Sequence, residues 1–387
     1  MHICIIPSWY PLRKNDIGGC FFREQALALK RYGHDVGVIY PHQISLRNII
    51  NSKSKPVFSF IDNEIPVFQS VNFGLSPRVP YINIMLYLNQ GIKIFDKYKE
   101  EYGLPDILHA HCVFNGGLLA KIIADKYGID YVITEHSSSY ARDNIKKWQY
   151  LLAEKTVSKS ALNIAVSESF CKLLDNKFKC PNAWTYIPNI LQKNFEQFDL
   201  SISPKNEAFT FCNVSILSDN KGIDLLLKSF SKAFSNTSNV ILKIGGDGGA
   251  RKYLQELAIE LGISDKVEFL GMLSREEVKK LMISSDAYVL SSKIETFGVV
   301  LIESLALGKP VVATRCGGPE SIVIDGFNGY SSNVDDIDCL SENMLKMYHN
   351  YDTFDNQAII NHCLSNFSEE VVVDKLTKEY MRILAEK

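Results

Sequence analysis

Short apolar segments alternate with segments of helical periodicity along most of the chain, and this alternation constrains the fold more than any other feature. In the first half, the segments expected as strands are Ile3–Ile6, Val36–Tyr40, Asp106–His111, Tyr131–Thr134 and Ile164–Val166. In the second half they are Thr210–Ser215, Val240–Ile244, Val267–Leu270, Ala287–Leu290 and Pro310–Ala313. Because parallel strands are joined by crossovers, usually helices, the alternation predicts an α/β fold with parallel sheets covered by helices on both faces.

The chain of 387 residues is long enough for two domains at roughly 100–200 residues each. The segment Ile187–Asn206 contains Pro188 and Pro204 and is predicted to be the linker. We therefore expect an N-terminal domain over residues 1–190 and a C-terminal domain over residues 191–367. A final helix over residues 368–387 is expected to pack back on the first domain. Residues 44–80, rich in Asn, Ser and Pro, give no clear prediction.

The formal net charge of −2 excludes a strongly basic nucleic-acid-binding protein. The charge is unevenly divided, since residues 1–190 carry 22 Lys and Arg against 16 Asp and Glu, and the remainder carries 20 against 28. The nine cysteines include no C-x-x-C pair, which favours a reduced cytoplasmic protein. No signal peptide or stretch of roughly 18 apolar residues is present, so the protein is expected to be soluble or at most peripheral on the inner face of a membrane.

The strongest local motif is Glu295-Thr-Phe-Gly-Val-Val-Leu-Ile-Glu303, which follows an expected strand and enters a helix near Gly298. The backbone N–H groups of Phe297, Gly298 and Val299 would lie at a helix start, where they can bind an anion. Glu303 falls in an apolar run, where an unpaired carboxylate would be costly. A sugar diphosphate fits this arrangement; the alternative is two solvated surface glutamates.

Several further segments resemble the retaining glycosyltransferase family 4. They are KGIDLLLKSF, LKIGGDGG, VEFLGMLSREEV, the Glu295–Glu303 block and CGGPESI in the second half, and PSWYP, IGGCFFREQALAL, DILHAHCVFNGG, ITEHSS and AVSESF in the first. The resemblance implies a GT-B fold, in which two Rossmann-like domains have parallel sheets facing a central cleft. It also implies a retaining hexosyltransferase that uses a nucleotide-diphosphate sugar and a glycan or lipid-linked acceptor, in bacterial surface polysaccharide synthesis such as that of lipopolysaccharide or capsule.

The same resemblance implies roles for individual residues of the C-terminal half. Glu303 would hold the ribose hydroxyls, and Glu295 would contact the transferred sugar near the Phe297–Val299 backbone. Lys221 would neutralise the diphosphate, although a surface lysine at a helix start is the alternative. The backbone of Gly271 and Met272 would border the nucleobase, unless these two residues form a plain turn at a strand end.

In the N-terminal half, the resemblance places His136 beside the transferred sugar and Gly18 and Gly19 opposite the donor phosphates. From spacing alone, a simple turn between a strand and a helix explains the two glycines nearly as well. His109 and His111 form an H-x-H pair at a strand end, and we expect His109 in the core and His111 facing the cleft or acceptor. Further clustered metal ligands are not evident in the sequence.

One departure from the family pattern affects the diphosphate site. An arginine usual in the family is replaced by Ile216, so a second group that neutralises the diphosphate is not identified. The pair Asp336 and Asp338 forms a D-x-D but lies in a polar segment, and we expect solvated surface there. We therefore expect no metal cofactor.

Three other functions fit the same architecture: a sugar-nucleotide epimerase, a non-catalytic sugar-nucleotide-binding protein, and a storage-glucan or sucrose synthase. The short chain weakly disfavours the third. Finally, the run Arg78–Lys99 mixes aromatic and aliphatic residues with Lys93, Lys97 and Lys99. This pattern fits docking on an anionic membrane surface or an ordinary amphipathic core helix.

Overall fold

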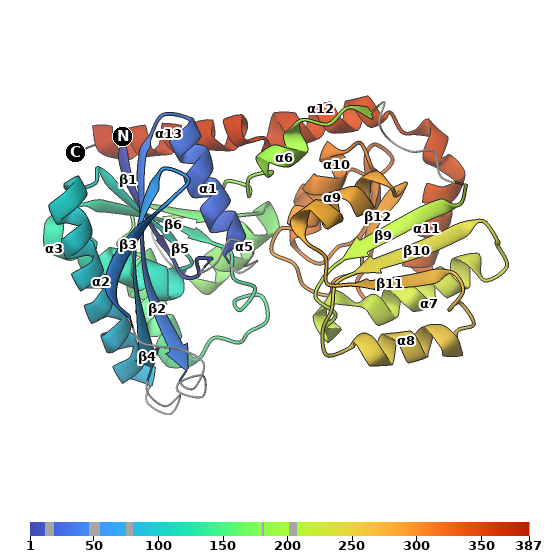
Figure 1. Cartoon of the computed structure of the whole chain (residues 1–387), viewed down its shortest axis with the longest axis horizontal. Coiled ribbons are helices and arrows are strands. Elements are labelled where there is room, and N and C mark those ends of the chain that lie inside the picture. Colours follow the sequence, from blue (N-terminus) through green and yellow to red (C-terminus); the bar gives the residue numbers. More distant parts are fainter. Residues whose placement is uncertain (12–18, 46–54, 75–79, 180–181, 201–206, 387) are drawn as a thin grey trace. The chain divides into compact units, whose positions relative to one another are not determined.

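The computed structural model describes residues 1–11, 19–45, 55–74, 80–179, 182–200 and 207–386 (Figure 1). The chain divides into two compact units. The first comprises residues 1–166, 171–190 and 372–387, and the second comprises residues 167–170 and 191–371. The boundary at Ile190 and Leu191 falls in the segment that the sequence suggests as a linker. That segment is not simply solvated, because Ile187, Ile190, Leu191 and Phe195 are all buried.

The first unit contains an eight-stranded sheet in the order β3-β4-β2-β1-β5-β6-β7-β8. Its strands are β1 (His2–Pro7), β2 (Asp35–Ser45), β3 (Lys55–Asp62), β4 (Ile65–Gly74), β5 (Ile107–His111), β6 (Asp130–Glu135), β7 (Leu162–Ala165) and β8 (Thr185–Tyr186). All neighbouring strands are parallel except β3, which runs antiparallel to β4 at the edge. The five strands expected in this half are all present.

The hairpin β3–β4 was not predicted from the sequence. Its turn residues, Asn63 and Glu64, both have positive φ angles, of 46° and 70°. Tight hairpins of this kind usually carry Asn-Gly or Asp-Gly, because glycine adopts positive φ without strain. The pair Asn-Glu lacks that signal, so the edge of this sheet could not be recognised.

The helices of the first unit are α1 (Cys20–Arg31), α2 (Pro80–Tyr102), α3 (Leu118–Tyr127), α4 (Lys147–Val157), α5 (Glu168–Lys177) and α13 (Glu369–Ala385). The final helix α13 joins the core of this unit through Val372, Leu376 and Tyr380, which cluster with β1 and α1. Figure 1 shows α1 and α13 on one side of the sheet and α2 and α3 on the other. Burial on both faces explains why β1 is a continuous apolar run over Ile3–Ile6 rather than an alternating pattern.

The second unit contains a six-stranded, fully parallel sheet in the order β11-β10-β9-β12-β13-β14. Its strands are β9 (Phe209–Val214), β10 (Val240–Gly245), β11 (Val267–Gly271), β12 (Ala287–Leu290), β13 (Val311–Thr314) and β14 (Gly329–Ser332). The five strands expected in this half are present. The sixth, β14, has the polar sequence Gly-Tyr-Ser-Ser and pairs only with β13, so its pattern did not identify it.

The helices of the second unit are α6 (Lys193–Glu196), α7 (Ile223–Phe234), α8 (Arg251–Glu260), α9 (Arg275–Ile283), α10 (Val299–Ala306), α11 (Ile337–Asn350) and α12 (Asn356–Phe367). The core is built from β9, β10 and the apolar faces of α7 and α11, including Phe211, Phe230, Phe234 and Met344. None of the described helices in either unit is long and apolar enough to cross a membrane.

Candidate functional site

The order of strands in the second unit places a switch point between β9 and β12. From β9 the chain adds β10 and β11 on one side, and then adds β12, β13 and β14 on the other. The loops that leave β9 and β12 therefore diverge at the carboxyl edge of the sheet. In open α/β sheets, ligands bind at this position. Lys221 lies in the first of these loops, and Glu295 lies in the second.

Backbone contacts hold these two loops together. The N–H of Lys293 donates to the carbonyl of Asn220 over 2.8 Å. Gly222 has a φ of 59°, and a side chain there would clash with the carbonyl of Ser291. Only glycine allows this close approach. The two loops therefore form one rigid rim along the switch point.

Lys221 and Glu295 form an ion pair across this rim. The distance from Lys221 Nζ to Glu295 Oε2 is 2.7 Å, and the two side chains are about a quarter and a fifth exposed. The sequence indicated both residues as parts of one donor site, but it did not indicate that they pair with each other. A partly exposed pair of this kind is open to competition by a ligand of either charge.

The loop around Glu295 is also fixed by the segment after β13. The N–H of Glu295 donates to the carbonyl of Cys316 over 3.0 Å, and the N–H of Gly318 donates to the carbonyl of Glu295 over 2.7 Å. A side chain on Gly318 would clash with the backbone of Phe297. Three strand ends thus converge on the same short segment.

Helix α10 begins directly after this segment. Gly298 precedes its first residue with a φ of 102° and no side chain caps the first N–H groups. The phenyl ring of Phe297 is buried and packs edge-on against Phe367, 5.9 Å between ring centroids. Only the backbone of Phe297 and Val299 can therefore contribute to an anion site at the helix start.

Glu303 lies one turn into α10 and its side chain is completely buried. One carboxylate oxygen accepts a hydrogen bond from the guanidinium of Arg275. The other, Oε2, has no hydrogen-bond partner among the described residues. Burial raises the pKa of Glu303, and the charge of Arg275 acts against this rise. A buried carboxylate oxygen without a partner is costly, so this site is suited to a ligand that donates hydrogen bonds.

The sequence reasoning missed Arg275. It is the first residue of α9, where Ser274 and Glu277 form the capping box that is visible in the sequence as S-x-x-E. The guanidinium also contacts the side-chain oxygen of Gln192 and lies 5.9 Å from the centroid of the Phe195 ring. No spacing rule links a residue at the start of α9 to a carboxylate in α10, so only the fold could identify the pair.

The remaining donor-site candidates lie at other strand ends of the same edge. Gly271, at the end of β11, has a φ of 74°, and its carbonyl accepts the N–H of Gly246 over 2.7 Å. Met272 follows and is 64% exposed. Ile216, at the end of β9, is also exposed and supplies no charge.

In the first unit, the switch point lies between β1 and β5. The hydroxyl oxygen of Ser8, after β1, lies 2.8 Å from the carbonyl oxygens of both His111 and Phe114, which share its one hydrogen. The turn η2 (Val113–Gly117) follows β5, and Cys112 and Asn115 there have positive φ angles of 66° and 67°. Such angles in residues other than glycine carry strain, which the surrounding contacts must hold.

Glu135, at the end of β6, holds the first residue of this turn and was not predicted. Its buried carboxylate accepts the N–H groups of Val113, His136 and Ser137 over 2.8, 2.9 and 2.7 Å. Burial raises the pKa of Glu135, whereas these hydrogen bonds lower it. The sequence contains Glu135 in the ITEHSS segment, but nothing in the pattern separates it from a solvated glutamate.

Three histidines cluster at this edge. Nδ1 of His111 lies 3.0 Å from Nε2 of His136, and the rings of His109 and His111 are 4.6 Å apart. Burial lowers the pKa of His109 and of His136 to about 3, and that of His111 well below its usual range. All three imidazoles are therefore neutral at physiological pH.

His109 is fully buried, as the sequence suggests, and its ring nitrogens contact the hydroxyls of Tyr380 and Thr134 at 2.6 and 2.7 Å. The expectation that His111 faces a cleft is wrong. Its side chain is completely buried, stacked on Phe22 at 4.8 Å, because β5 is an interior strand with helices on both faces. His111 therefore reaches a ligand only through His136, which is partly exposed.

Of the two glycines predicted to face the donor phosphates, Gly18 and Gly19, the structure describes only Gly19. Gly18 lies outside the described residues. Gly19 immediately precedes α1 with a φ of 75°, and a side chain there would approach the carbonyl of Trp9. Its backbone conformation therefore requires glycine, whether or not a ligand is bound.

The D-x-D pair lies at the surface, with Asp338 exposed as expected, and both residues have local partners. Asp336 caps α11 by accepting the N–H of Cys339 over 2.9 Å, and Asp338 pairs with Lys232 at 2.6 Å. Among the described residues, no group of three or more His, Cys, Asp or Glu side chains is arranged to hold a metal ion.

Comparison with known proteins agrees with this architecture. A model described as Glycosyltransferase Family 4 matches residues 21–192, and one described as Glycosyl transferases group 1 matches residues 195–361. An uncharacterized glycosyltransferase of Methanocaldococcus jannaschii is 26% identical over 99% of this chain and 97% of its own length.

Among solved structures, sucrose-phosphate synthase from Thermosynechococcus elongatus aligns with a TM-score of 0.80 at 16% identity, covering 100% of both chains. The Anabaena protein HepE in complex with UDP aligns with a TM-score of 0.74 at 17% identity, covering 99% of this chain and 100% of its own. The protein thus has the GT-B fold. The full coverage by sucrose-phosphate synthase also removes the argument that this chain is too short for a synthase of that type.

Two α/β units, each with a switch point at the carboxyl edge of its sheet, define the GT-B class of glycosyltransferase folds. The chain belongs to the glycosyltransferases that the family 4 and group 1 models describe, which together match nearly all of residues 21–361.

Proposed function

We propose that this chain is a retaining glycosyltransferase that moves a hexose from a nucleotide diphosphate to a glycan or lipid-linked acceptor, in the synthesis of a bacterial surface polysaccharide. One observation carries the proposal. In the unit with the switch point at β9 and β12, the fully buried Glu303 has an oxygen without a partner, and the ion pair Lys221–Glu295 lies on the adjacent loops.

The buried carboxylate suits the ribose of a nucleotide. Two neighbouring ribose hydroxyls donate hydrogen bonds, and Glu303 Oε2 lacks a donor. Hydrogen bonds to an ionised acceptor are stronger than neutral ones. Arg275 favours the ionised form of Glu303, because its charge opposes the effect of burial on the pKa. In this arrangement Arg275 is a positioning residue for the donor.

The ion pair suits the diphosphate and the sugar. A diphosphate would compete with Glu295 for Lys221 and leave the Glu295 carboxylate to accept hydroxyl hydrogen bonds from the transferred sugar. The uncapped N–H groups at the start of α10 add partial positive charge on the same edge. Lys293, which lies on the β12 loop and pairs with Asp335 at 3.6 Å, is our candidate for the second cation in place of the arginine that Ile216 replaces.

The chemistry asks for positioning and charge stabilisation rather than a dedicated carboxylate nucleophile. Retention is explained by front-face attack assisted by the leaving phosphate. His136 is proposed to contact the transferred sugar through a neutral imidazole, consistent with its lowered pKa. A neutral ring accepts or donates a hydrogen bond without adding charge near the anomeric carbon.

A panel of UDP-, GDP- and ADP-sugars tests the donor assignment, because a ligand that binds only the folded state raises the melting temperature. NMR of the product from the stabilising donor then reports whether the anomeric configuration is retained. Formation of an epimer from the donor alone would indicate an epimerase instead. Binding without turnover of any glycan or sugar phosphate acceptor would indicate a non-catalytic sensor.

The acceptor side includes a proposed contact with an anionic membrane. Helix α2 buries Tyr87, Ile94, Phe95 and Tyr98, so one face of it packs in the core. Its first two turns, however, expose Tyr81, Ile82, Met85 and Leu86. Lys93 and Lys97 are exposed further along the helix. Apolar side chains beside basic ones on one helix are typical of interfacial helices.

A further inference from the structure

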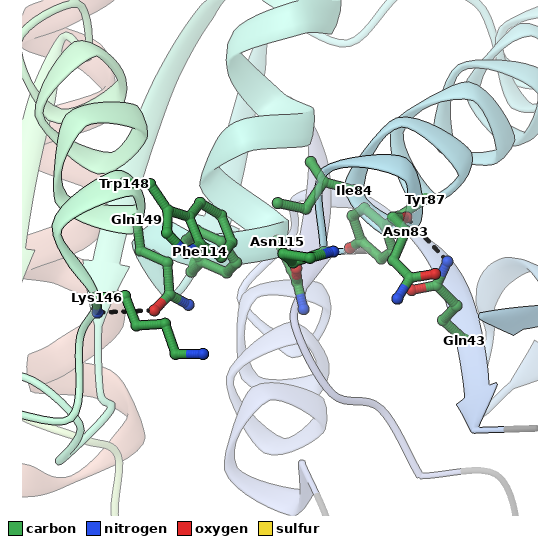
Figure 2. A pocket seen from close by; sticks show the side chains of 10 residues that line it. Gln43, Asn83, Ile84, Tyr87, Phe114, Asn115, Lys146, Trp148 and Gln149 are labelled. Carbon is green, nitrogen blue, oxygen red and sulfur yellow. Dashed lines mark hydrogen bonds between the residues drawn. The ribbon is translucent and has the colours of Figure 1, made fainter. Parts of the chain in front are cut away.

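A separate pocket in the first unit lies between the start of α2, the turn η2 and the start of α4. Its volume is about 300 Å³, at the lower end of the roughly 300–1,000 Å³ of small-molecule sites. Figure 2 shows Asn115 between Tyr87 and Asn83 on one side and Trp148 and Gln149 on the other. All of these residues line the pocket, and none belongs to the donor site described above.

Four carboxamide side chains line this pocket, those of Gln43, Asn83, Asn115 and Gln149. A carboxamide both donates and accepts hydrogen bonds, as a sugar hydroxyl does. The carboxamide of Asn115 makes no hydrogen bond to another described residue, and the Oε1 of Gln149 accepts only the N–H of Lys146, at 2.9 Å, which leaves its amide hydrogens available. Among the described residues that line the pocket, none is a carboxylate.

The hydroxyl of Tyr87 is a more direct indication of a ligand. Tyr87 is 94% buried, since its exposed fraction is 6%, and its hydroxyl has no hydrogen-bond partner among the described residues. Burial raises the pKa of this phenol, so it stays protonated and keeps a hydrogen to donate. Buried polar groups normally have hydrogen-bond partners, and no described residue supplies one to Tyr87, so a hydroxyl of a bound molecule can take that place.

The opposite wall is aromatic. The rings of Phe114 and Trp148 meet edge-to-face at 5.8 Å, and Trp148 also contacts Tyr81 at 4.9 Å. A pyranose has one face of C–H groups that stacks on such rings and a rim of hydroxyls that fits carboxamides. Phe114 and Asn115 lie on the strained turn η2, which Glu135 and Ser8 hold in place, so this wall is ordered before any ligand binds.

We propose that this pocket binds one neutral pyranose ring of a glycan acceptor, with Tyr87 and the carboxamides bonding its hydroxyls and Trp148 stacking on its apolar face. The proposal adds the chemical class of the acceptor to the proposed function. It rests on that function only for identifying the bound sugar as an acceptor. Binding of the sugar itself does not require the donor site.

The test is direct binding to the full chain without nucleotide, with methyl glycosides of glucose, galactose and mannose and their disaccharides as probes. Trp148 is one of three tryptophans, so its fluorescence should change on binding. Tyr87→Phe removes only the hydroxyl. It should weaken sugar affinity roughly three- to tenfold and leave nucleotide affinity and melting temperature at wild-type values.

Tyr140→Phe is the matched control, because Tyr140 is also buried in this unit with a hydroxyl that has no partner among the described residues, but it lies outside the pocket. It should leave sugar affinity unchanged. Equal affinities in Tyr87→Phe and the wild type, or no binding of any neutral glycoside, would overturn the proposal. Preference for glucuronate or glucose 6-phosphate would also overturn it, since Lys146 and the start of α4 would then define an anion site. In each of these cases the donor panel still reports on the proposed function separately.

Discussion

The two switch points of this protein have the same kind of topology but differ in the charge of the side chains that gather there. At β9 and β12, the loops carry the ion pair Lys221–Glu295, and a second ion pair, Arg275–Glu303, joins the helices α9 and α10. At β1 and β5, the loops converge around clustered histidines that burial keeps neutral. The geometry is shared because parallel sheets of this order always open at the same edge. The charges differ because, on our proposal, one edge binds a diphosphate and the other binds neutral sugar hydroxyls.

The largest expected effect is at Glu303. Replacing it with alanine removes charge-assisted hydrogen bonds to the donor and should cost about 1.5–3 kcal/mol of binding free energy, roughly 10- to 150-fold in affinity. Isothermal titration with the stabilising nucleotide measures this. Glu342→Ala, an exposed glutamate of α11, is the control. A loss of less than twofold in folded Glu303→Ala would rule out the ribose role.

The neutral histidines should make the first unit sensitive to acid. A buried histidine with a lowered pKa takes up a proton more readily in the unfolded chain than in the folded one. The free energy of unfolding is therefore unaffected above pH 6.5 and decreases as the pH falls towards 3. For His109 alone, the unfolding free energy should fall by about 2 kcal/mol between pH 7.5 and 5.

Tryptophan fluorescence can isolate this effect, because Trp9, Trp148 and Trp184 all lie in the first unit. The fluorescence transition should shift with pH more than the remaining calorimetric transition. His109→Gln keeps a donor and an acceptor but does not titrate, so its pH dependence should be shallower. Identical pH dependence in both proteins would show that His109 does not stay neutral in the folded state.

His136 distinguishes positioning at the reaction centre from a structural role. If it contacts the transferred sugar, His136→Ala should lower kcat by roughly tenfold, the effect of about one strong hydrogen bond, while nucleoside diphosphate affinity stays near wild type. Steady-state kinetics and nucleotide titration on the same preparation give both values. His349→Ala, an exposed histidine of α11, serves as the control. Equal losses of turnover and affinity would mark a structural histidine.

The comparison extends to net charge, since residues 1–190 are basic and the remainder is acidic. Each lysine near an anionic surface contributes about 1 kcal/mol, so Lys93→Glu with Lys97→Glu should abolish most sedimentation with anionic liposomes. Added salt should weaken binding of the wild type. Lys99 is left unchanged because its ammonium lies 4.9 Å from the centroid of the Tyr127 ring. Equal binding to neutral and anionic vesicles would remove the membrane contact.

The smallest effect is expected from chelation. Lys221 and the start of α10 are proposed to take the part that Mg²⁺ plays in metal-dependent transferases, so EDTA should leave turnover unchanged. Asp336→Ala should lower stability by about 1 kcal/mol through the lost cap of α11 without changing turnover. Complete loss of activity in EDTA, restored by Mg²⁺ or Mn²⁺, would contradict the proposed site and return attention to Asp336 and Asp338.

The sequence by itself determined the features that depend on neighbours along the chain. Ten strands were predictable because buried parallel strands are continuous apolar runs, and the start of α9 was predictable from Ser274 and Glu277. The Glu295–Glu303 block also depends on neighbours along the chain, since strand, loop and helix follow one another directly. It therefore indicated the carboxyl edge of the second sheet.

Tertiary structure alone decided which side chains meet. Arg275 reaches Glu303 and Lys221 reaches Glu295 because separate crossovers end at one sheet edge, and local periodicity carries no information about that meeting. The same reason explains His111. A histidine at the end of a strand has the same local pattern whether it opens to solvent or is covered, and here Phe22 from α1 and His136 from the loop after β6 cover it. Burial is a property of the packed layers, so it became visible only when the layers were in place.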